Sequence, residues 1–216
     1  MKTQLKTSQI FFVISILLVS FSLQNCAPVF SELQGARTVG KDNVELTPSY
    51  SSVSFADEDG SEKVQNEVGI QVALGVSPRV DIRARYEYVW IPDDGGNVSA
   101  IGIGPKFSLV KDKLAISLPI GRALGEGTSE SWEFLPTVLF SLPIKKDILD
   151  LNVSPKYIIQ FCEECESFLA INAGFSISSN LNEWAIRPEF GLLYNPGESG
   201  HYAQFSIGVS KVFGKK

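Results

Sequence analysis

The feature that most constrains the fold is a strict alternation of apolar and polar residues over long stretches of the chain. Between Val80 and Trp90 every even-numbered residue is apolar or aromatic, whereas the odd-numbered residues from 81 to 87 are all charged. Successive side chains of a β-strand point to opposite faces, so this alternation sorts the two kinds of residue onto opposite faces of a strand. A helix would mix them, and the sequence therefore predicts strands.

Ten segments show this alternation and are the candidate strands. Each is longer than the roughly 5–6 residues typical of soluble strands and long enough for the roughly 9–11 residues that cross a bilayer at a tilt. Ten is an even number, as single-chain bacterial barrels require. The segments are 43–55, 64–77, 80–91, 97–110, 113–124, 131–143, 148–161, 166–178, 182–194 and 201–213.

The connections between these segments alternate between short and long. Short links follow the even-numbered candidate strands, near 77–79, 111–113, 145–147 and 180–182. Longer and mostly acidic links follow the odd-numbered ones, near 56–62, 93–96, 125–130, 163–166 and 195–200. Short periplasmic turns and long outer loops are typical of outer-membrane proteins. The pattern predicts an antiparallel up-and-down transmembrane β-barrel of about ten strands, with both mature termini at the periplasmic side.

The amino-terminal region differs from the rest of the chain. Residues 1–25 carry two lysines and then a short apolar run, which is the layout of a secretory signal peptide. Residues 26–42 lack a sustained period and are interpreted as a lipid-anchor and linker segment ahead of a barrel domain over 43–214. The boundary Leu23-Gln24-Asn25-Cys26 resembles a lipoprotein signal box, which implies acylation of Cys26. The alternative is a conventional cleavage that leaves Cys26 as a plain thiol.

The polar face of the candidate strands carries a nearly balanced set of charges. In a membrane barrel this face fills the lumen, and we expect the opposite charges to pair across it. In a soluble β-sandwich or lipocalin-like barrel the branched face would instead point inward. The predicted lumen charges are Asp81, Arg83, Arg85, Glu87, Lys106, Glu133, Asp150, Lys156, Glu183, Arg187 and Glu189.

Aromatic residues lie near many strand ends, as expected of the girdles at the two membrane interfaces. They are Tyr88, Trp90, Trp132, Phe161, Trp184, Tyr194 and Phe213. The last segment resembles the carboxy-terminal insertion signal of outer-membrane proteins through Ser206, Gly208 and Phe213. It differs from that signal at Lys211 and in the tail after Phe213. The resemblance implies the barrel-assembly machinery and the lipid bilayer as partners.

The chain as a whole resembles small outer-membrane barrel proteins of the Bacteroidetes type. The resemblance is carried by the Cys26-Ala27-Pro28 start, by the stretch 32–41 and by the ten alternating segments. It implies a location in the outer membrane more than an activity.

Few residues point to chemistry. The sole histidine, His201, lies in an acidic loop with Glu198, without the convergent carboxylates that a protease site needs. Cys162 and Cys165 predict a loop-tip disulfide in an exported chain, with a redox or zinc pair as the alternative. The acidic run 57–60 lacks EF-hand spacing, and Gly102 and Gly104 are not followed by a helix. We therefore expect no cofactor, no metal and no nucleic-acid partner.

The expected function is that of a non-enzymatic outer-membrane barrel with a charged, side-chain-filled lumen. It would act as a structural or interaction component, or as an accessory subunit of an envelope complex together with other outer-membrane proteins. The alternative is a narrow pore for small solutes or ions. Packing of the lumen separates the two, because about eight strands enclose a space that side chains just fill, and ten enclose only slightly more.

Overall fold

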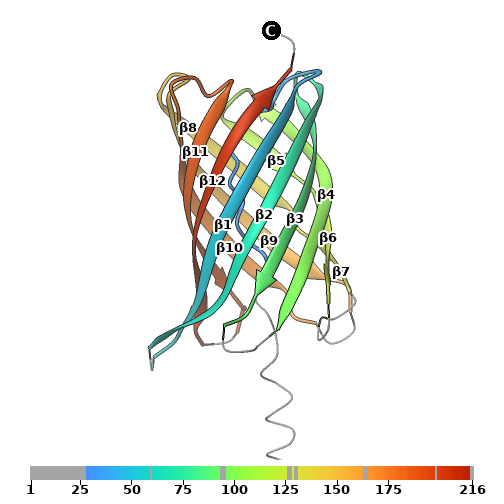
Figure 1. Cartoon of the computed structure of the whole chain (residues 1–216), viewed down its shortest axis with the longest axis vertical. Helices are drawn as coiled ribbons and strands as arrows, with labels where there is room; N and C mark the ends of the chain where they lie inside the picture. The colour runs from blue at the N-terminus through green and yellow to red at the C-terminus, as the bar shows by residue number, and fades with distance from the viewer. Residues whose placement is uncertain are drawn as a thin grey trace, which may run out of the picture.

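The computed structural model describes residues 28–58, 60–92, 96–125, 128, 131–162, 165–197 and 199–214. These residues form one closed antiparallel β-barrel, as Figure 1 shows. The strand segments are β1 (Val44–Ala56), β2 (Ser61–Ser77), β3 (Val80–Trp90), β4 (Asn97–Val110), β5 (Leu114–Ser117), β6 (Ile120–Leu124), β7 (Trp132–Phe134), β8 (Thr137–Lys145), β9 (Leu149–Gln160), β10 (Phe168–Ile177), β11 (Trp184–Tyr194) and β12 (His201–Phe213).

The barrel wall has ten strands, because β5 with β6, and β7 with β8, are two halves of interrupted strands. The interruptions fall at Pro119 and Pro136, which have no N–H to donate to the sheet. The neighbouring Leu135 N–H donates to the Pro119 carbonyl at 3.0 Å, which joins the two breaks. The barrel closes where β12 pairs with β1, from Val44 opposite Phe213 onward. The predicted ten-strand antiparallel barrel is confirmed.

Short and long connections lie at opposite ends of the barrel (Figure 1). We call them the short-turn end and the long-loop end. The short-turn end carries the β2–β3, β4–β5, β8–β9 and β10–β11 turns, and the long-loop end carries the other five connections. Asp112 and Asp147 occupy the left-handed region in two of the short turns, with φ of 60° and 56°. A short polar side chain tolerates this conformation well.

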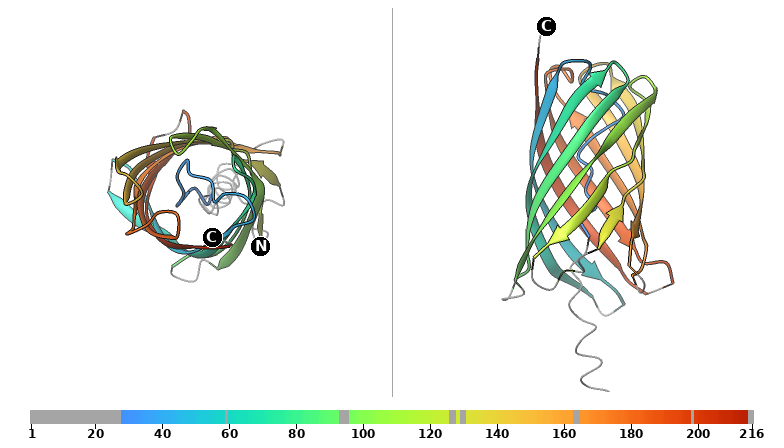
Figure 2. Two further views of the ribbon diagram at one scale, coloured as in Figure 1. Left: turned by 90° about the horizontal axis from the view of Figure 1, so that it is seen from above. Right: turned by 90° about the vertical axis from the view of Figure 1, so that its right-hand side faces the viewer.

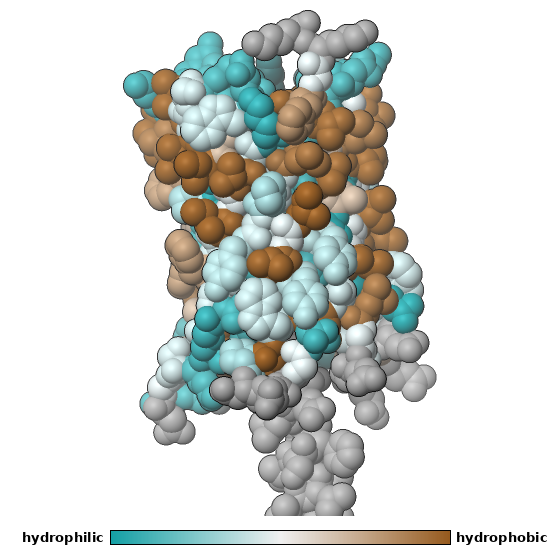
Figure 3. All heavy atoms as spheres, viewed as in Figure 1, coloured by the Kyte–Doolittle hydropathy of each residue, from teal (hydrophilic) through white to brown (hydrophobic). Residues whose placement is uncertain are grey.

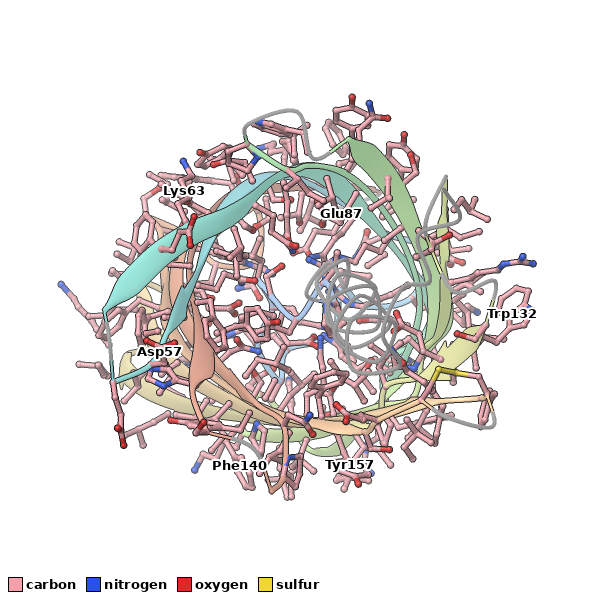
Figure 4. All side chains as sticks on the ribbon, turned by 90° about the horizontal axis from the view of Figure 1, so that it is seen from below. Asp57, Lys63, Glu87, Trp132, Phe140 and Tyr157 are labelled. Carbon is pink, nitrogen blue, oxygen red and sulfur yellow. A yellow bond between two sulfur atoms is a disulfide. The ribbon has the colours of Figure 1, made fainter. Side chains whose placement is uncertain are left out.

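The outer face of the barrel is apolar. In the space-filling view, hydrophobic residues and paler aromatic rings cover the middle of the wall, and hydrophilic residues gather at both ends (Figure 3). Figure 4 shows Trp132, Phe140 and Tyr157 on the outside of the ring of strands and Glu87 on the inside. The exposed large apolar side chains include Val68, Ile70, Leu74, Ile82, Ile103, Leu142, Ile171, Phe175, Ile186, Phe205, Ile207 and Val209.

The apolar outer face distinguishes a membrane barrel from a soluble β-sandwich or barrel. The branched face points outward on every strand, and the charged face points inward. A soluble barrel would expose its charges to water and bury its branched residues. A continuous apolar outer surface around a closed wall needs lipid, and the described strands close on themselves where β12 pairs with β1. The chain is therefore a transmembrane β-barrel, and the soluble alternative is wrong. Among the described residues, no helix is both long and apolar enough to span a membrane.

Residues 28–40 are the described part of the predicted anchor and linker segment. They run lengthwise through the lumen, as both views in Figure 2 show. We call residues 28–40 the lumen segment. Its Phe30, Leu33 and Ala36 side chains are fully or almost fully buried. The segment contacts the wall through its backbone and through a mixed set of side chains. Its sequence therefore shows no regular alternation of apolar and polar residues.

The apolar core of the molecule lies where the lumen segment meets the wall. Phe30 packs in a buried cluster with Val53, Leu135, Ile158, Ala170 and Leu193. Val29 packs with Val89 and Val98, and Ala36 with Ala115 and Leu139. Three separate apolar contacts along one extended segment fix its depth in the barrel.

Candidate functional site

The candidate site is the filled lumen, and two of its ion pairs lie between residues of the wall itself. Lys106 of β4 lies 3.5 Å from Asp81 of β3, and both side chains are fully buried. Arg85 and Glu87, two residues apart on β3, lie 2.8 Å apart through Nε and Oε1. These pairs combine residues that the sequence placed in the lumen.

A third cluster is centred on Glu45 of β1. Its two carboxylate oxygens accept hydrogen bonds from Arg83 at 2.9 Å and Arg187 at 2.8 Å. Glu45 and Glu67 of β2 are both buried, and neither belongs to the set of lumen charges predicted from the sequence. Both could have been found from parity, since Glu45 alternates with Leu46 and Glu67 with Val68 along their strands.

Other lumen charges pair with residues of the lumen segment. Lys156 Nζ lies 2.6 Å from Glu32 Oε1. Asp150 accepts a hydrogen bond from Arg37 Nε at 2.6 Å. The same guanidinium reaches Asp147 at 3.0 Å and Asp112 at 3.8 Å, so it ties three carboxylates together at the short-turn end.

One carboxylate holds two successive peptides of the lumen segment. Glu189 of β11 accepts the N–H of Glu32 at 2.7 Å and the N–H of Leu33 at 2.8 Å. Arg187, on the same face of the same strand, donates to the Leu33 carbonyl at 2.8 Å. Leu33 has a φ of 52°, which is unusual for a bulky residue. Hydrogen bonds to both sides of this residue hold that conformation in place.

The wall also binds the segment through its backbone carbonyls. Lys156 and Asn172 both donate to the Phe30 carbonyl, at 3.2 and 2.8 Å. Lys106 donates to the carbonyls of Gly35 and Arg37. Arg85 donates to the Ser31 carbonyl and hydroxyl, and Gln71 to the Glu32 carbonyl at 3.1 Å. Buried polar groups are costly unless hydrogen-bonded, so these contacts stabilise the buried carbonyl groups of the segment.

Glycines of the wall make room for the segment. A Cβ on Gly208 would lie 3.4 Å from Leu33 Cδ1 and 3.1 Å from Thr47 Cγ2. A Cβ on Gly191 would lie 3.0 Å from the Phe30 ring. These two glycines therefore face side chains of the lumen segment.

Two predicted lumen charges lie at the margins of the network. Glu133 of β7 is half-buried and lines a small cavity of about 70 Å³ beside Arg85 and Lys156. Glu183 is half-buried in the turn ahead of β11. A larger cavity of about 640 Å³ opens at the short-turn end, around Arg37 and the neighbouring turns.

The remaining predicted residues fall at the rim or outside the described part. Ser206 faces inward and donates to Ser51 at 2.8 Å, while Phe213 is half exposed on the outer face at the short-turn end.

Cys162 and Cys165 are joined by a disulfide. His201 stacks on Tyr194, with ring centroids 5.5 Å apart. Cys26, the signal peptide, Asp59 and Glu198 lie outside the described residues.

The predicted aromatic girdle has a dense part on β1 and β3 near the long-loop end. Trp90 packs against Tyr50 and Tyr88, with ring centroids 6.4 and 6.2 Å apart. The Tyr50 hydroxyl donates to Asn66 at 2.9 Å. An apolar ring with a polar tip suits the headgroup zone of a bilayer.

Within the described part of the chain, no group of three or more histidine, cysteine or carboxylate side chains could hold a metal ion. Fold and site together define a transmembrane β-barrel whose lumen is filled by its own amino-terminal segment.

No protein-family model and no curated protein matches the sequence. Among solved structures, the chain is similar to the translocator domain of the autotransporter NalP from Neisseria meningitidis (9% identity, 95% of this chain and 96% of that chain, TM-score 0.47). It is also similar to the transport unit of the autotransporter AIDA-I from Escherichia coli (10%, 91% and 97%, TM-score 0.41). A third is the attachment invasion locus protein Ail of Yersinia pestis (8%, 80% and 99%, TM-score 0.37).

Proposed function

We propose that this protein is a non-enzymatic component of the bacterial outer membrane, a barrel closed by its own lumen segment. It serves as a structural or interaction subunit of the envelope, with other outer-membrane proteins as partners. The predicted signal peptide and the even-stranded, lipid-facing barrel support this location. Acylation of Cys26 and insertion by the barrel-assembly machinery through Ser206, Gly208 and Phe213 belong to the same proposal.

The observation that carries the proposal is the way in which the lumen is occupied. Glu189, Arg187, Lys156 and Lys106 all bind the segment from inside the wall. Space that would form a pore in a ten-strand barrel is therefore taken by backbone and buried apolar side chains. A filled barrel suits a scaffold better than a channel.

The surface that remains for partners is the long-loop end. There the β1–β2 hairpin extends beyond the rest of the barrel (Figure 1), and its tip carries the exposed Asp57 and Glu58. Exposed charge of one sign steers partners of the opposite charge, so a basic partner surface fits this end best.

Single-channel conductance in a planar bilayer tests the proposal. The native barrel is compared with a variant that lacks residues 28–40 and with the double substitution Arg83→Ala plus Arg85→Ala. We expect the native protein to be silent and the deletion variant to conduct. Steady conductance of the native protein would establish the narrow-pore alternative. If the inserted deletion variant were silent as well, the lumen segment would not be what closes the barrel.

A further inference from the structure

The lumen segment runs from the long-loop end of the barrel to the short-turn end. An amino terminus in the periplasm would require the opposite direction. At its start, Val29 packs with Val89 and Val98, which lie on either side of the β3–β4 connection at the long-loop end. At its other end, the Val39 N–H donates to Asp81 at 3.2 Å, beside the β2–β3 turn. The segment therefore enters at the long-loop end and leaves at the short-turn end.

The barrel fixes this path along its whole length. Next to the long loops lie the Val29 cluster and the buried Phe30 ring, further along lies the Glu32 pair with Lys156, and at the far end lies the Arg37 cluster. After Gly40, the Asp42 N–H donates to the Gly75 carbonyl at 2.9 Å, and β1 begins at Val44 on the short-turn side. The chain then turns back and forms the wall around its own start.

Chain length determines which side of the membrane the preceding residues can reach. Cys26 is two residues ahead of Pro28, and a fully extended chain spans at most about 3.6 Å per residue. Its Cα atom therefore lies within about 7 Å of that of Pro28. The 13 residues of β1 alone rise roughly 40 Å along the wall. Two residues are therefore too few to reach from Pro28, next to Val29, to the short-turn side.

We propose that the amino terminus of the mature protein is displayed on the outer surface of the cell, beside the long loops. Acyl chains on Cys26 then insert into the outer leaflet, on the opposite side from the carboxy terminus. The inference rests on the proposed function, which places the short turns in the periplasm. It replaces the earlier expectation that both mature termini lie on the periplasmic side.

Antibody binding to intact cells tests the inference. One variant carries an epitope between Ala27 and Pro28, a second carries it in the β11–β12 loop between Pro196 and Gly197, and a third carries it after Lys216. We expect the first two to be labelled equally on intact cells and the third only after permeabilisation. Labelling of the first epitope only after permeabilisation, with the loop epitope accessible, would overturn the inference. If the loop epitope were also hidden, the outer-membrane orientation itself would be wrong.

The position of the acyl anchor has its own test. Cells are grown with labelled palmitate, and a specific protease site replaces the epitope between Ala27 and Pro28. Protease added to intact cells should remove the label from the barrel, and a Cys26→Ser variant should carry none. Label that stays on the barrel until the cells are permeabilised would place the anchor in the periplasmic leaflet. An unlabelled native chain would reject acylation while leaving the epitope result to decide the topology.

Discussion

Lys156 of β9 and Glu32 of the lumen segment form a buried ion pair, with Nζ and Oε1 2.6 Å apart. Each side chain is less than a tenth exposed. The pair joins the wall to the segment that it encloses, so it links the fold of the barrel to closure of the lumen. Removing one partner would leave the other charge in a space with little water.

Changing this pair should therefore reveal strong coupling. Glu32→Gln or Lys156→Met alone should lower the free energy of unfolding by about 3–5 kcal/mol, as expected when a buried charge loses its partner. The double variant should cost less than the sum of the two. Urea unfolding in detergent micelles measures all three, with the exposed Glu58→Gln as the control. Strict additivity would show that the two side chains do not interact.

Gly208→Leu should displace the lumen segment. The new side chain would occupy the space of Leu33, whose Cδ1 lies 3.4 Å from the position of the Cβ. Overpacking of this kind costs about 1–3 kcal/mol, and we expect channel openings that the native protein lacks. Ile207→Leu places the same residue next along β12 on the lipid side and should leave conductance unchanged. Equal behaviour of the two variants would argue against a specific contact with Leu33.

Arg37 should hold the end of the lumen segment in the short-turn mouth. Arg37→Ala removes hydrogen bonds to Asp150 and Asp147. Charge-assisted hydrogen bonds contribute about 1.5–3 kcal/mol, which corresponds to roughly tenfold or more in local opening. A Val39→Cys reporter should then react correspondingly faster with a water-soluble maleimide. Lys41→Ala, at an exposed cation nearby, serves as the control and should leave the rate unchanged.

Phe213 should matter for insertion more than for stability. It is half exposed on the outer face and pairs with Val44 at the seam where the barrel closes. Phe213→Ala should reduce the amount of folded barrel in the membrane of growing cells, seen as loss of the heat-modifiable band on gels. The matched control is Phe205→Ala, a lipid-facing phenylalanine on the same strand. Equal losses for both variants would mean that any lipid-facing ring on β12 suffices.

The disulfide between Cys162 and Cys165 should protect a loop without stabilising the barrel. Cross-links stabilise less as the closed loop shortens, and this one closes a very short loop. The double variant Cys162→Ser plus Cys165→Ser should keep the melting temperature of the barrel. A glutamate-specific protease should cut it faster between positions 161 and 167, with cleavage at the β1–β2 loop as the internal control. A large fall in melting temperature would contradict this assignment.

The amino-acid sequence by itself determined the wall of this protein. Each predicted strand lies within a few residues of an observed one or of a proline-interrupted pair, and the inward and outward faces match. Such agreement is expected because alternation with a period of two is a local property, and a membrane demands it over long segments. Asp81, Lys106 and Glu189, which the same parity directs inward, are buried in the structure.

Only the tertiary structure decided what fills the lumen. Residues 28–40 are held largely through backbone N–H and carbonyl groups, which every sequence possesses, so their role leaves no side-chain pattern. The partners of Arg187 and Lys156 likewise depend on which strands face each other after closure and on the segment between them. The sequence determined which side chains point inward, and the closed barrel determined that several of the charged ones, among them Lys106, Lys156 and Glu189, bind the chain's own lumen segment.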